Sequence, residues 1–192
     1  MISFKHFMML FAVSLLIAAC GSKNNGQSDT QTVSESNNTA ESGEMTDASY
    51  VEQATFEDMS GNTVNISDFE GKVVLIDFWE TWCKPCLAIF PTMQKLLEEY
   101  PDDFVVLAVN PGFADTEEDA KNFIAEHDYD FNYLLDTNNL SEKLNVQSIP
   151  FKVYVDAEGN FIKSNIGSYG EEEDYKALKS VIEEHKMQSA GE

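Results

Sequence analysis

The sequence predicts an α/β domain with a mixed central sheet flanked by helices, and three observations support this class. Two apolar runs, Val73–Phe78 and Phe104–Val109, are typical of strands buried on both faces. After the first run, apolar residues recur at helical spacing over Leu87–Leu97. Near the C-terminus, Phe151–Val155 and Phe161–Ile166 flank strong turn residues and predict a hairpin. Strand, helix and strand followed by a hairpin give a sheet with both parallel and antiparallel pairs.

The N-terminus has the pattern of a secretion signal. Lys5 and His6 precede an apolar run that is too short to span a bilayer comfortably. The run ends in Leu16-Ile17-Ala18-Ala19-Cys20-Gly21, which resembles the bacterial lipobox. The resemblance implies a lipoprotein signal peptide over residues 1–19, cleaved before a lipid-modified Cys20. The alternative is an uncleaved anchor helix with an incidental cysteine. Both interpretations place the rest of the chain outside the cytoplasm, tethered to a membrane of the bacterial cell envelope.

Residues 20–49 are expected to form a flexible linker. Ser, Asn, Thr, Gln, Glu and Gly dominate this segment, and large apolar residues are almost absent. Such a composition cannot bury enough surface to offset the entropy lost on ordering, so we expect no secondary structure here.

The folded domain is expected over residues 50–187, followed by a tail over 188–192. It opens with a hairpin extension near 54–56 and 63–66, around Ser60-Gly61-Asn62. Thr116, with Asp119 three residues later, predicts the capped start of a helix over 116–127. The remaining expected elements are a capped turn at Ser67 or Asp68, a short apolar segment at 133–136, a helical turn at 140–144 and a closing helix at 172–186.

Composition excludes several classes of function. The formal net charge of −22 argues against nucleic-acid binding and against charge-driven docking on an anionic membrane. Three cysteines are too few for a disulfide-stapled scaffold. Neither a second CxxC motif nor a nearby histidine completes a zinc site, so we expect no metal and no cofactor. We expect a monomer.

Cys83-Lys84-Pro85-Cys86 lies where the first buried strand gives way to a helix. Free backbone N–H groups and the positive end of the helix dipole would face Cys83. This setting lowers a thiol pKa from ~8.5 toward ~3.5–7.5, so a thiolate is available near neutral pH. The pair is therefore placed for dithiol–disulfide chemistry. The alternative is an inert structural disulfide.

These residues resemble the thioredoxin superfamily, and most of all its membrane-tethered TlpA/ResA-like thiol–disulfide oxidoreductases. The resemblance covers about residues 51–186. It rests on Asp77-Phe78-Trp79, on Trp82 with the CxxC motif, on Pro91, on Ile149-Pro150, on the turn 156–160 and on the leader 68–72 before the first buried strand. It implies a thioredoxin-like fold and the reduction of disulfides in cysteine-containing client proteins, with electrons from a membrane or extracytoplasmic donor protein.

The resemblance also assigns roles to single residues. Cys83 would be the exposed attacking thiolate, and Cys86 the resolving thiol that releases the reduced client. Lys84 lies between the two cysteines and should favour the thiolate, whereas Glu80 could oppose it. Trp82 would form an apolar rim, while Trp79 belongs to the core.

Two further residues support the cysteine pair from elsewhere in the chain. Asp77 lies in an apolar strand, where burial should raise its pKa and suit it to take a proton from Cys86. The alternative is an aspartate at a strand end that reaches solvent. Pro150 matches the superfamily's cis-proline, which would turn the backbone of Ile149 toward a bound client.

One departure from the closest branch concerns the client. The TlpA/ResA-like pattern commonly has Glu three residues after the second cysteine, where this chain has Ile89. Together with Asp77 and Ile149, this favours a general-purpose site over one dedicated to apocytochrome c.

Three other functions remain open. A peroxiredoxin-like (AhpC/TSA-related) thiol peroxidase shares the core fold, but that family needs Pro-x-x-x-Thr-x-x-Cys. Here Thr81 lies two residues before Cys83, without such a proline. A copper-binding assembly factor resembles CxxxC with a distant histidine ligand, which this chain lacks. The third is a non-catalytic tethered module.

Overall fold

The computed structural model describes residues 45–189, with side chains to residue 186. The expected signal peptide, Cys20 and most of the expected linker lie outside these residues. Described elements begin at helix α1, Asp47–Glu52. Secondary structure was not expected before Tyr50, but the Thr46 side chain accepts a hydrogen bond from the Ser49 N–H and Val51 is buried. An N-cap and one anchoring apolar residue therefore place α1 across the expected boundary between linker and domain.

A seven-stranded mixed sheet forms the centre of the domain, in the order β2-β1-β5-β4-β3-β6-β7. Strands β3, β4 and β5 are parallel, and the hairpins at the two edges are antiparallel. Their bounds are Thr55–Asp58 (β1), Thr63–Asn65 (β2), Val73–Phe78 (β3), Phe104–Asn110 (β4), Asn132–Leu135 (β5), Phe151–Val155 (β6) and Phe161–Ile166 (β7). The predicted α/β class, mixed sheet and N-terminal hairpin are confirmed.

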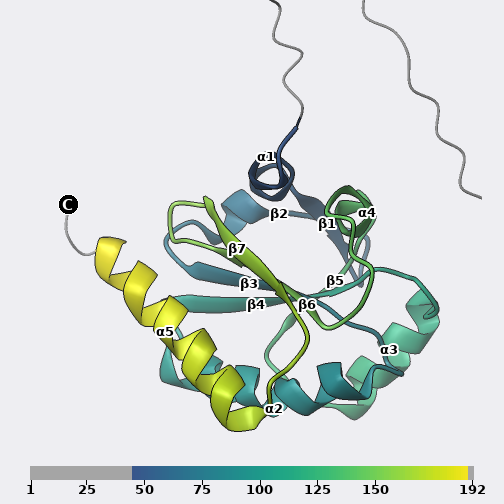
Figure 1. Ribbon diagram of the computed structural model, residues 1–192. Helices are drawn as coiled ribbons and strands as arrows, with labels where there is room; N and C mark the ends of the chain where they lie inside the picture. The colour runs from purple at the N-terminus through teal and green to yellow at the C-terminus, as the bar shows by residue number, and fades with distance from the viewer. Residues whose placement is uncertain (1–44, 190–192) are drawn as a thin grey trace, which may run out of the picture. The chain divides into compact units, whose positions relative to one another are not determined.

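The helices cover both faces of the sheet (Figure 1). Those on one face are α2 (Lys84–Glu99), α3 (Glu117–Glu126) and α5 (Glu171–Ser189). On the other face lie α1, the 3-10 turn η1 (Ile66–Phe69) and α4 (Leu140–Lys143). The predicted Thr116–Asp119 capping box is present at the start of α3.

Strand alternation divides the buried residues of β3 between two cores. Val73 and Leu75 pack against α2 and α5, whereas Val74, Ile76 and Phe78 pack on the opposite face. Successive side chains of a strand point to opposite faces, so Asp77 belongs on the α2 side. The core on that side also contains both cysteines of the CxxC motif.

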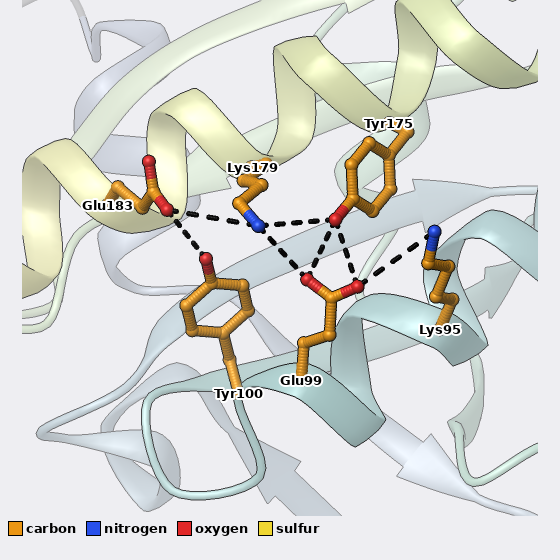
Figure 2. Close-up of polar contacts among 6 residues, drawn as sticks. All are labelled: Lys95, Glu99, Tyr100, Tyr175, Lys179 and Glu183. Carbon is orange, nitrogen blue, oxygen red and sulfur yellow. Dashed lines mark hydrogen bonds and ion pairs between the residues drawn. The ribbon is translucent and has the colours of Figure 1, made fainter.

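A polar network joins α5 to the end of α2 (Figure 2). The Tyr175 hydroxyl lies 2.8 and 2.9 Å from the two carboxylate oxygens of Glu99, and the Lys179 ammonium lies 3.2 Å from one of them. Tyr100 donates a hydrogen bond to Glu183 at 2.8 Å. These contacts attach α5 to the C-terminal end of α2, the helix whose N-terminus carries the cysteines.

Candidate functional site

The two cysteines of the CxxC motif form a disulfide at the N-terminus of α2. Their Cα atoms are 5.3 Å apart. Cys83 is the N-cap, and its sulfur accepts a hydrogen bond from the Cys86 N–H at 3.3 Å. Pro85 occupies the first turn of the helix, where a missing N–H costs no intrahelical bond. Cys83 therefore lies at the positive end of the helix dipole, as the sequence predicted.

Exposure differs between the residues around this pair. Cys86 is fully buried and Cys83 is only 3% exposed, so the exposed position expected for Cys83 is wrong for the disulfide form. In the disulfide, the Cys83 sulfur is bonded to the sulfur of the fully buried Cys86. Lys84 is exposed, and Trp82 is 57% exposed, as a rim residue should be. Trp79 is fully buried, as expected of a core residue.

Asp77 is a fully buried carboxylate in the core that contains Cys86. Neither of its oxygens has a hydrogen-bond partner among the described residues. Burial raises its pKa from 3.8 to about 7; the nearby Lys152 opposes this rise and Asp174 adds to it. The alternative of a strand-end aspartate that reaches solvent is therefore wrong. Asp77 can exchange a proton near neutral pH.

Two charged residues beside Asp77 were not identified from the sequence. Lys152 lies directly opposite Asp77 in the β3–β6 register, is 1% exposed and donates to the Gly167 carbonyl at 2.7 Å. Asp174, in the first turn of α5, is also buried and binds the Ser168 hydroxyl. A lysine within the apolar strand Phe151–Val155 was the available signal for Lys152, but only the strand pairing places it beside Asp77.

The peptide bond between Ile149 and Pro150 is cis, as expected. Pro150 is buried directly before β6, and its carbonyl accepts a hydrogen bond from the Gly167 N–H at 2.8 Å. Since Lys152 binds the carbonyl of the same glycine, the cis-proline segment and the loop after β7 are joined on both sides of Gly167.

The sequence predicts for Glu80 only a charge that opposes Lys84, but the structure gives its carboxylate specific partners. Glu80 follows Trp79 in the chain, and its side chain is completely buried. One carboxylate oxygen accepts from the Ala114 N–H at 2.9 Å, and the other accepts from the Trp82 indole at 2.5 Å. The acidic side chain that precedes Cys83 is thus an acceptor for two neighbouring loops.

Comparisons with known proteins point to one group. The sequence profile of the AhpC/TSA family matches residues 48–164. A thioredoxin-like protein of Bacillus subtilis, YneN, is 35% identical over 116 residues, which cover 60% of this chain and 68% of that protein. The thiol-disulfide oxidoreductase ResA of Bacillus thuringiensis is 29% identical over 126 residues, covering 65% and 72% of the two chains.

A solved structure gives the same result for the fold. The exposed lipoprotein thioredoxin Etrx1 of Streptococcus pneumoniae matches with a TM-score of 0.56 and 33% identity. The match covers 66% of this chain and 98% of Etrx1, which confirms the thioredoxin-like fold. None of the helices between residues 45 and 189 has the length and apolarity needed to cross a membrane.

Proposed function

Since the chain belongs to the AhpC/TSA family of thioredoxin-like proteins, we propose that it reduces disulfides in client proteins outside the cytoplasm. Its activity is thiol–disulfide exchange, the activity named for its ResA relatives. The observation that carries the proposal is the Cys83–Cys86 disulfide at the N-terminus of α2, with buried Asp77 in the same core.

The proposed cycle starts from the reduced pair. The Cys83 thiolate attacks one sulfur of a client disulfide, forms a mixed disulfide and releases the other client sulfur as a thiolate. Asp77 takes the proton of the Cys86 thiol. The Cys86 thiolate then attacks Cys83, forms the disulfide seen in the structure and releases the second client thiolate. Two electrons pass to the client, and a donor dithiol protein restores the pair by the reverse exchange.

Client contacts are assigned to the residues around Cys83. Trp82 offers an exposed apolar face, and the backbone of Ile149 precedes the cis-proline. Exposed Lys84 would favour the Cys83 thiolate through its charge. The acidic surface of the chain favours clients that are not themselves strongly acidic.

A lipid anchor on Cys20 is proposed from the lipobox-like sequence. The name of Etrx1, an exposed lipoprotein, supports the same placement for this chain. Alkyne-fatty-acid labelling of cells expressing the full-length protein should modify the wild type and leave Cys20→Ser unlabelled. Label that persists in Cys20→Ser would contradict the anchor.

Trapping tests the roles of the two cysteines. In Cys86→Ser the mixed disulfide cannot be resolved, so client proteins should accumulate on Cys83 and be released by dithiothreitol. Cys83→Ser is the matched control and should trap none, and it should lose insulin-disulfide reduction. Trapping by Cys83→Ser instead of Cys86→Ser would reverse the assignment. Insulin reduction that is unchanged in Cys83→Ser would favour a non-catalytic module.

Peroxide is the second candidate substrate, because the peroxiredoxin-like alternative shares the core fold and the matched profile is that of the AhpC/TSA family. Two observations favour disulfide exchange: Cys83 forms a disulfide with Cys86, three residues along the chain, and the Pro-x-x-x-Thr-x-x-Cys arrangement is missing. Hydrogen peroxide consumption by the purified reduced protein should be slow. Rapid turnover that depends on Cys83 would favour the peroxidase.

A further inference from the structure

Glu80 places a buried carboxylate between the cysteine loop and the loop that follows β4. One of its oxygens accepts hydrogen bonds from the Ala114 N–H at 2.9 Å and the Asp115 N–H at 3.4 Å. The other oxygen accepts from the Trp82 indole at 2.5 Å. The backbone carbonyl of Glu80 accepts from the Cys83 N–H at 3.0 Å. A single residue thus contacts the attacking cysteine, its tryptophan neighbour and the loop after β4.

Asp115 makes the reciprocal connection. Its carboxylate accepts from the Thr81 N–H at 2.7 Å and from the Thr81 hydroxyl at 2.8 Å. It also accepts from the Asn110 side chain at 2.9 Å, and Asn110 in turn binds the Gly112 N–H. The two carboxylates therefore link the loops in both directions. Glu80 accepts backbone hydrogen bonds from the loop after β4, and Asp115 accepts one from the cysteine loop. We call this pair the Glu80–Asp115 clamp.

The clamp holds two exposed aromatic rings. Trp82 is 57% exposed and Phe113 is 52% exposed, although both large side chains would ordinarily be buried. Trp82 binds Glu80 directly, and Phe113 immediately precedes the bound Ala114 N–H. Phe113 also lines a hollow of about 350 Å³ together with Asn145, Val146 and Gln147, the segment that leads to Ile149 and the cis-proline. Glu80 thus binds one ring directly, through the Trp82 indole, and the other through the backbone that follows Phe113.

The chemistry of the acceptors explains why a carboxylate is needed. Glu80 receives N–H groups on both oxygens, from the backbone on one and from the indole on the other. A glutamine at this position has only one acceptor oxygen, so its NH₂ group would face a donor in either orientation. A buried donor left without an acceptor is costly, so one of the two loops would move.

We propose that Glu80 is a positioning residue for client recognition, which fixes Trp82 and Phe113 as one apolar surface beside Cys83. The proposal rests on the disulfide-reductase function above and adds a specificity. The preferred client is an extended cysteine-bearing polypeptide with an apolar side chain close to its cysteine. A small disulfide without such a side chain gains nothing from the clamp.

The test compares a large and a small substrate in the Glu80→Gln variant of the full-length protein. The rate constant for reducing oxidised insulin should fall about tenfold more than the rate constant for 2-hydroxyethyl disulfide, because the rings are no longer held together. For insulin the change should lie in KM more than in kcat. Glu118→Gln, which changes an exposed carboxylate in α3, is the matched control and should keep the wild-type ratio.

Indole NMR signals report the clamp directly, because the chain has only two tryptophans. In Glu80→Gln the Trp82 N–H should exchange with solvent at least ~10-fold faster, since it loses a charged acceptor. The buried Trp79 signal should be unchanged, which shows that the fold persists. An unaltered Trp82 signal would overturn the proposal, as would equal losses with both substrates, which would mean that Glu80 acts on the thiolate itself.

Phe113→Ala decides the matter if Glu80→Gln does not fold, because Phe113 is a surface residue. The proposal requires the same selective loss with insulin, and wild-type selectivity in Phe113→Ala would refute it. Failure of the underlying function looks different, since the wild type would then reduce neither substrate.

Discussion

Asp77→Asn should make the protein more stable, and the gain should depend on pH. The wild-type carboxylate is fully buried, has no hydrogen-bond partner among the described residues and has its pKa raised from 3.8 to about 7. In the unfolded chain the same group ionises near its ordinary pKa. Between pH 4 and pH 7 the folded protein therefore keeps a proton on Asp77 that the unfolded chain has lost. The free energy of unfolding of the wild type falls as the pH rises through this range.

The size of this effect follows from the pKa difference. At about 1.36 kcal/mol for each tenfold change in proton affinity, a rise from 3.8 to about 7 corresponds to about 4 kcal/mol. Asparagine stays neutral and resembles the protonated acid, so the variant lacks this loss. Well below pH 7, Lys152 faces an uncharged side chain in both proteins, protonated Asp77 in the wild type and asparagine in the variant. The attraction of Lys152 for the ionised Asp77 carboxylate is already included in the raised pKa of Asp77.

Urea unfolding of the disulfide form between pH 4 and pH 8 measures the effect. The difference in unfolding free energy between Asp77→Asn and wild type should be smallest at pH 4 and should rise by about 4 kcal/mol by pH 7. Asp128→Asn, an exposed aspartate, is the matched control, and its difference from wild type should not vary with pH. A pH-independent difference for Asp77→Asn would refute the reasoning.

The same substitution should slow catalysis. Without a carboxylate to take the Cys86 proton, resolution of the mixed disulfide at pH 7 should slow by about 100-fold in single-turnover quenched-flow experiments. Formation of the mixed disulfide by Cys83 should change much less. An unchanged resolution rate would remove Asp77 from the proposed mechanism.

Three further predictions follow from other parts of the structure. Lys152→Met should raise the pKa of Asp77 further, because the charge of Lys152 opposes that rise in the wild type. The pH dependence of the resolution rate should therefore shift to higher pH, and a shift to lower pH would contradict the role of Asp77 as proton acceptor. Glu99→Gln should lower the melting temperature at pH 7 by no more than about 3 °C. Hydrogen bonding from Tyr175 lowers the pKa of Glu99, so that difference should shrink as the pH falls through the folded-state pKa, and its persistence at pH 3 would count against the network. Thr116→Ala should cost about 1 kcal/mol in urea unfolding through loss of the α3 cap, and no cost would mean that the cap adds nothing.

The fold was largely predictable because its signals are local. The buried run Val73–Phe78, the Thr116–Asp119 capping box and the turn after Val155 each determine an element within a few residues. Helix α1 was missed because its first residues, Asp47–Ser49, continue the polar composition of the linker. Only Val51, buried in the core, shows why the helix forms there.

The site was predictable in part for the same reason. The cysteine spacing, Asp77 in an apolar strand and Ile149-Pro150 are visible in the sequence, and the structure gives the disulfide, the buried carboxylate and the cis bond. Glu80 was misjudged because its acceptor role depends on the N–H groups of Ala114 and Asp115. These lie 34 and 35 positions further along the chain.

The sequence by itself therefore determined the chemistry, since a thiol pair at a helix N-terminus depends on spacing and local structure. The tertiary structure alone decided the environment of that pair. It placed Lys152 opposite Asp77 through strand register and joined Glu80 to the loop after β4. Burial and charge act through space, so the pKa of Asp77 and the arrangement of the two loops joined by Glu80 depend on residues that no local pattern connects.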